Sequence, residues 1–143
     1  MRILGLDIGS KRIGVALSDE LGYTAQGVET VTYTDPESAA DRIQGIAESR
    51  NVTEIVIGIP YNMNGTEGPQ VRNVRDFIER LRKRINVPIH EWDERLTTFA
   101  AERVLLEADI SRAKRRKVVD KLAAVLILQG FLDSQTFKGS TGV

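Results

Sequence analysis

Two apolar runs at the N-terminus, separated by a short polar turn, constrain the fold of this chain more than any other feature. Residues 3–8 are interrupted only by Gly5 and Asp7, and residues 13–17 follow a turn at residues 9–12. Two such runs around a glycine-containing turn predict a β-hairpin. Asp7 needs a compensating partner, because a carboxylate in an apolar strand is costly. Either its carboxylate accepts hydrogen bonds from backbone N–H groups of the turn, as aspartates at turns do, or it belongs to a metal or phosphate site.

Composition favours one soluble domain. The 143 residues suit a single domain, expected over residues 1–135, and residues 136–143 are expected to form a flexible C-terminal tail. The absence of cysteine excludes a disulfide framework and thiolate catalysis. The longest apolar run, residues 122–128, is too short to span a bilayer, so we expect a cytoplasmic protein with no membrane partner.

The net charge of +0 conceals an uneven distribution. Residues 1–68 hold 5 Lys or Arg against 10 Asp or Glu, whereas residues 69–121 hold 14 against 9. A neutral total argues against purely electrostatic nucleic-acid binding. The asymmetry nevertheless indicates a basic surface for a polyanion beside a local cluster of acids.

The pattern after the hairpin predicts an α/β domain. Further strands are expected over residues 25–33, 53–59 and 88–92, the first of them completing an antiparallel meander. Helices are expected after Asp35, after Gly68, after Thr97 or Thr98, and over residues 118–132. Gly68 is either a tight helix start or an anion site at that helix N-terminus.

Two further acids have ambiguous settings. Glu94, with Asp93 before it, follows the last expected strand, where open α/β sheets usually place their ligands. Asp120 lies in the first turn of the last helix, where an acid is often only a match to the helix dipole. If the first and fourth strands are neighbours, Asp7, Glu94 and Asp120 can converge on one edge of the sheet. Three such carboxylates need cations, and one or two Mg²⁺ or Mn²⁺ ions would satisfy them.

Basic residues provide candidate nucleic-acid contacts. They stand in the first turn, beside Glu94 and in a charge block before the last helix, and comprise Lys11, Arg12, Arg95, Lys114, Arg115, Arg116 and Lys117. Residues 109–117 are expected to form a mobile loop, which is either a phosphate-binding segment or only a solvated linker.

Four segments of the sequence resemble the motifs of a known family. Residues 6–19, 58–70, 93–98 and 120–129 are similar, in order, to the motifs of the bacterial pre-16S ribosomal RNA nuclease family, also described as Holliday junction resolvase-like. The resemblance implies a ribonuclease H-like fold, with a five-stranded mixed sheet flanked by helices. It places Asp7, Glu94 and Asp120 on an acidic triad and makes Asp93 a candidate supporting acid. Asn64 stands where the family often has Asp, and Gly27 where Pro is frequent.

The expected function is therefore metal-dependent hydrolysis of phosphodiester bonds by a two-metal nuclease, with Mg²⁺ or Mn²⁺ as cofactor. The resemblance points to the 5′ end of pre-16S rRNA as substrate. The alternatives are a Holliday junction resolvase that acts on branched DNA and an RNA- or DNA-binding module that does not cleave. A monomer and a homodimer both remain open, and a resolvase that cuts two symmetric strands would need the dimer.

Overall fold

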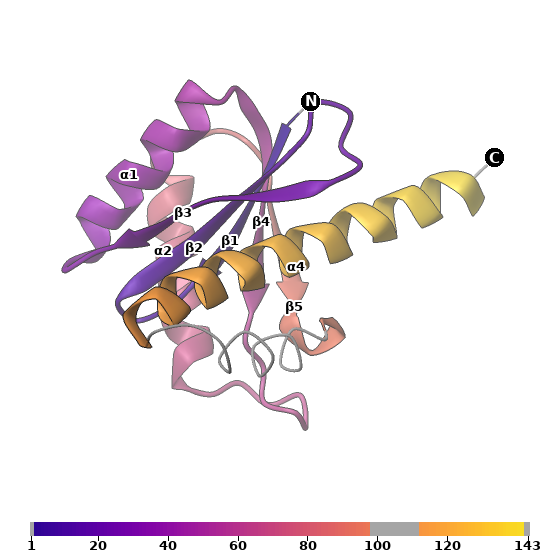
Figure 1. Ribbon diagram of the computed structural model, residues 1–143. Helices are drawn as coiled ribbons and strands as arrows, with labels where there is room; N and C mark the ends of the chain where they lie inside the picture. The colour runs from indigo at the N-terminus through magenta and orange to yellow at the C-terminus, as the bar shows by residue number, and fades with distance from the viewer. Residues whose placement is uncertain (1, 98–111, 142–143) are drawn as a thin grey trace.

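A single five-stranded mixed sheet forms the centre of the molecule (Figure 1). The computed structural model describes residues 2–97 and 112–141, and the side chains of residues 2–97 and 120–135. The strands are β1 (Arg2–Ile8), β2 (Arg12–Ser18), β3 (Ala25–Thr32), β4 (Val52–Ile59) and β5 (Ile89–Asp93), in the order β3-β2-β1-β4-β5. The first three are antiparallel, whereas β4 is parallel to β1 and β5 is parallel to β4. The predicted meander is confirmed, and the first and fourth strands are neighbours, which is the condition for Asp7, Glu94 and Asp120 to converge.

Helices cover both faces of the sheet. Helices α1 (Pro36–Ser49) and α2 (Pro69–Arg82) lie on one face, and α4 (Arg112–Thr141) crosses the other (Figure 1). Asp35 begins α1 as its N-cap, since its side chain accepts a hydrogen bond from the Ser38 amide at 2.9 Å. A short 3₁₀ helix, η1 (Glu94–Leu96), directly follows β5. None of the helices, as far as the structure describes them, is long and apolar enough to cross a membrane.

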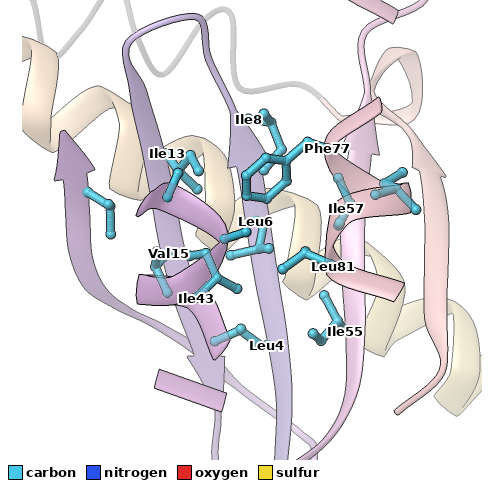
Figure 2. Close-up of a cluster of buried hydrophobic side chains, with 14 of the residues drawn as sticks. Leu4, Leu6, Ile8, Ile13, Val15, Ile43, Ile55, Ile57, Phe77 and Leu81 are labelled. Carbon is cyan, nitrogen blue, oxygen red and sulfur yellow. The ribbon is translucent and has the colours of Figure 1, made fainter. Parts of the chain in front are cut away.

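The larger hydrophobic core lies between the sheet and the helix pair α1 and α2 (Figure 2). Successive side chains of a strand point to opposite faces, so β1 sends Leu4, Leu6 and Ile8 into this core. A smaller core lies between the sheet and α4, and consists of Ile3, Ala16, Val56, Ala124, Ile127, Leu128, Phe131 and Leu132. Each face of the sheet therefore buries its own layer.

The last helix is longer than the sequence pattern indicated. It begins at Arg112, not at residue 118, and continues to Thr141, not only to residue 132. The basic block at residues 114–117 thus has helical backbone, so the expected loop is wrong for residues 112–117, whereas residues 109–111 lie outside the described residues and the expected mobility stays a prediction. Lys, Arg and Ala are good helix formers, and no Gly or Pro separates the block from the apolar part of the helix.

The expectations for residues after Thr97 and for the C-terminal tail stay predictions. The helix expected after Thr97 or Thr98 lies outside the described residues. Residues 136–141, expected in a flexible tail, are helical, and the mobility of the tail stays a prediction.

Candidate active site

Asp7 lies between two glycines on neighbouring strands. It pairs with Gly14 of β2, and the pairing of Leu6 with Ile57 brings Gly58 of β4 beside it on the other side. Leu6 and Ile8 point into the α1 and α2 core, so the alternation of β1 directs Asp7 to the face covered by α4. Since glycine has no side chain, other elements can approach the sheet backbone closely on both sides of Asp7.

Asp120 comes near Asp7 because α4 approaches β2 closely. A methyl group added at Gly14 would overlap the backbone oxygen of Asp120, so the helix rests directly on this glycine. Glycine within a strand often marks such a close backbone approach. The Asp120 carboxylate is 18% exposed and accepts a hydrogen bond from Arg12 Nε at 2.7 Å. Asp120 therefore lies over β2, one strand away from Asp7.

Glu94 approaches Asp7 from the opposite side, over β4. A Cβ atom at Gly58 would lie 2.6 Å from Glu94 Oε1 and 2.8 Å from Glu94 Cγ, which places this side chain over β4. Local structure directs it there, because Asp93 caps η1 by accepting from the Arg95 amide at 2.9 Å. Trp92 Nε1 donates to Thr97 Oγ1 at 3.1 Å across the same turn.

The structure thus brings the three predicted acids onto adjacent strands, with Asp120 over β2, Asp7 on β1 and Glu94 over β4. Neighbouring strands lie about 4.8 Å apart. The donor set suits Mg²⁺ or Mn²⁺, since hard cations prefer carboxylate oxygens. As they stand, however, no three His, Cys, Asp or Glu side chains in the described part of the chain are grouped to hold an ion. Asp120 faces the guanidinium of Arg12 instead.

The predicted basic residues have different settings. Lys11 is exposed in the hairpin turn, whereas Arg12 is only 28% exposed in its ion pair with Asp120. Arg95 binds both carboxylate oxygens of Asp93, at 2.7 to 3.1 Å, and lies 5.6 Å from the Tyr61 ring centroid. These hydrogen bonds from Arg95 lower the pKa of Asp93. The side chains of Lys114, Arg115, Arg116 and Lys117 lie outside the described ones.

Two residues that support the hairpin turn were not singled out from the sequence. The Tyr33 hydroxyl donates to the carbonyl of Gly9, and Gln70 Nε2 donates to the carbonyl of Ile8 at 3.1 Å. Burial raises the pKa of Tyr33, so its hydroxyl keeps the proton that this bond needs. Gln70 lies at the start of α2 and ties that helix to the end of β1. No local pattern pointed to either contact, since each joins residues far apart in the sequence.

The loop after β4 differs from the family pattern at Asn64, and the structure shows what this residue does. The Asn64 side-chain oxygen accepts from the Thr66 amide at 3.1 Å and from the Thr66 hydroxyl at 2.6 Å. An aspartate oxygen accepts such bonds equally well. Gly65, with a φ of 86°, makes the turn between them.

Comparison with curated proteins gives relatives that match almost the whole chain. Proteins named "Putative pre-16S rRNA nuclease" are 53% identical over 137 residues in Bacillus cereus (strain G9842), 54% over 134 in Desulforamulus reducens and 56% over 135 in Symbiobacterium thermophilum. Each alignment covers 94% of this chain, and it covers 100%, 98% and 94% of the three relatives, respectively.

Solved structures share the fold at low sequence identity. RuvC of T. thermophilus in complex with Holliday junction substrate has a TM-score of 0.57 at 12% identity, covering 95% of this chain and 96% of that one. The fowlpox virus Holliday junction resolvase has a TM-score of 0.57 at 14% identity, covering 94% and 99%. The fold is ribonuclease H-like, as predicted. A family model described as "RuvX: Holliday junction resolvase" matches residues 1–134, and this chain belongs to the RuvX family.

Proposed function

We propose that this protein is a metal-dependent nuclease that hydrolyses phosphodiester bonds during 5′-end processing of pre-16S rRNA. The observation that carries the proposal is the row formed by Asp120, Asp7 and Glu94 over three adjacent strands. Relatives at 53 to 56% identity that are named for this activity support the choice of substrate.

The three carboxylates would hold one or two Mg²⁺ or Mn²⁺ ions. Bound there, the ions would activate a water molecule and stabilise the attacking and leaving oxygens of the phosphodiester. The pairing of β1 with β2 and β4 fixes the backbone of Asp7, and so the point on the sheet from which its carboxylate extends. Gly14 and Gly58 have no side chains of their own, so the Asp120 backbone and the Glu94 side chain can approach the strands on either side of Asp7.

Basic side chains would hold the phosphates that flank the cleaved bond. Lys11 is exposed in the turn that follows Asp7. Lys114, Arg115, Arg116 and Lys117 belong to the first turns of α4, the helix that also carries Asp120. Arg12 and Arg95 remain candidates, although each binds an acid in the described state.

A Holliday junction resolvase is the second candidate, because the family model that matches this chain has that description. Such an enzyme would have to act as a dimer on its symmetric substrate. A module that binds without cleaving is less favoured, since it would not need three acids gathered on adjacent strands.

Cleavage of a short pre-16S RNA and of a four-way DNA junction, with Mg²⁺, Mn²⁺ or EDTA, tests the proposal. We expect RNA cleavage that EDTA abolishes and that falls about a thousandfold or more in Asp7→Asn and in Asp120→Asn, because each variant loses a charged ligand. Asp41→Asn is the matched control, since Asp41 lies on α1, on the opposite face of the sheet. Cleavage that survives EDTA and both substitutions would contradict the proposal, and junction cleavage alone would favour the second candidate.

A further inference from the structure

Arg12 forms an ion pair with one of the proposed metal-binding acids. Its Nε donates to Asp120 Oδ2 at 2.7 Å, and the two side chains are only 28% and 18% exposed. The contact spans 108 positions in the sequence and joins β2 to α4. Arg12 and Gly14 are two residues apart, so both lie on the face of β2 that α4 covers. The guanidinium and the point of closest helix approach are thus adjacent.

The ion pair between Arg12 and Asp120 is partly shielded from solvent. Salt screens partly buried charges less than exposed ones, and a hydrogen bond between two charged groups is stronger than one between neutral groups. The ion pair between Arg42 of α1 and Glu29 of β3 is more exposed, with side chains that are 55% and 31% exposed. Arg12 therefore compensates much of the charge that Asp120 would otherwise present.

The carboxylate oxygen that accepts from Arg12 is also a natural ligand for a hard cation. A guanidinium and a metal ion cannot both take the same position at this oxygen without repulsion. In the described part of the chain, this oxygen is bonded to Arg12 and no three acids form a group that is ready to hold an ion.

We propose that Arg12 is the internal counter-ion of Asp120, and that a divalent ion must displace its guanidinium in order to bind. Arg12 is a positioning residue that sets the metal affinity of the site. Once displaced, its guanidinium is available for a substrate phosphate next to the metal. The inference rests on the proposed function, because it takes Asp120 as a metal ligand.

Binding of Mn²⁺ to the protein without nucleic acid tests this role, with titration calorimetry or the electron paramagnetic resonance signal of free Mn²⁺ as the readout. We expect Arg12→Gln to bind Mn²⁺ roughly tenfold more tightly than the wild type, since the competing charged hydrogen bond is gone. Arg12→Lys, which keeps the charge and loses the guanidinium geometry, should show a smaller gain.

Lys11→Gln is the matched control for charge alone. It removes a positive charge from the neighbouring position, and Lys11 is exposed, so we expect a gain of no more than about twofold. In an Asp120→Asn background, Arg12→Gln should produce no gain, because the effect passes through Asp120.

The outcomes separate the inference from the proposed function. Equal or weaker Mn²⁺ binding by Arg12→Gln, an equal gain in Lys11→Gln, or a gain that persists with Asp120→Asn would overturn the role of Arg12. If the wild type also loses Mn²⁺ on Asp120→Asn, the proposed function stands even then. A wild type that binds no divalent ion would overturn both. If Arg12→Gln does not fold, the gain or its absence in Arg12→Lys decides.

Discussion

The two faces of the sheet are built from the same strands but pack in different ways. The face toward α1 and α2 presents large aliphatic side chains, such as Leu4, Leu6 and Ile57, which fill the space to the helices (Figure 2). At the intervening positions, the face toward α4 presents Gly5, Gly14 and Gly58. On one face, large side chains therefore separate the helices from the strands, whereas on the other face the helix packs directly against the strand backbone at the glycines.

The difference separates stability from the proposed chemistry. Burial of large side chains makes the α1 and α2 face the main source of hydrophobic stabilisation. The α4 face buries less side-chain surface at its glycines. Because these glycines have no side chains, the helix that carries Asp120 approaches the strand that carries Asp7. Substitutions on the two faces should therefore have different signatures.

The largest effect is expected from Gly14→Ala. The added methyl group would overlap the backbone oxygen of Asp120, and backbone cannot rotate away as a side chain can. We expect a loss of about 3 kcal/mol or more in the free energy of unfolding, measured by urea denaturation, together with loss of cleavage by the protein that remains folded. Gly45→Ala is the control, since a Cβ there meets nothing within 4 Å in α1 and should stabilise by up to about 1 kcal/mol.

Leu6→Ala tests the other face. Leu6 is fully buried in the α1 and α2 core, so its truncation should cost about 2 to 5 kcal/mol in urea denaturation. Cleavage per folded molecule should change little at a temperature where the variant is folded, because the cavity opens on the face away from the acids. A loss of activity much larger than the loss of folded protein would show that the two faces are not independent.

Gly58→Ala should affect chemistry more than stability. Its methyl group would lie 2.5 Å from Ile127 Cδ1 and 2.6 Å from Glu94 Oε1, which are both ends of side chains that can move. We expect about 1 to 2 kcal/mol of destabilisation and a fall of roughly ten- to a hundredfold in cleavage rate, because Glu94 must shift.

Gly130→Ala provides the matched comparison for this variant. The added methyl group also crowds the α4 face, 2.9 Å from Trp92 Cζ2, but its contacts are with Trp92 and not with Glu94. It should destabilise the protein to a similar small extent with little change in cleavage. Equal losses of activity in the two variants would mean that crowding of α4, and not displacement of Glu94, is the cause.

The smallest effect is expected from Asp93→Asn and depends on pH. Hydrogen bonds from Arg95 lower the pKa of Asp93 in the folded protein. A carboxyl with a lowered folded-state pKa stabilises the fold above its unfolded pKa, which is about 3.9, and loses this contribution as the pH falls through the folded value. The variant should melt about 2 °C below the wild type at pH 7, since the pair is near the surface. The difference should shrink below pH 4, and a difference that stays constant down to pH 2 would exclude the ion pair as its cause.

Much of the fold could be predicted from the sequence, because the local pattern of apolar residues determines where most of the strands and helices lie. Two apolar runs around a glycine-containing turn predicted the hairpin, and the apolar run at residues 53–59 predicted a further strand. The beginning of α4 was missed, since a basic block next to an apolar helix resembles a linker in composition although its residues favour helix.

The candidate acids were named from the sequence, because a carboxylate in an apolar strand stands out and because the motifs resemble a known family. What the tertiary structure alone decided is how these acids are held. Three contacts hold them, and each joins residues more than 30 positions apart: α4 packs on Gly14, Arg12 binds Asp120, and Glu94 lies over Gly58. Such contacts depend on how the elements pack, and nothing in the local sequence specifies which cation a given acid will meet.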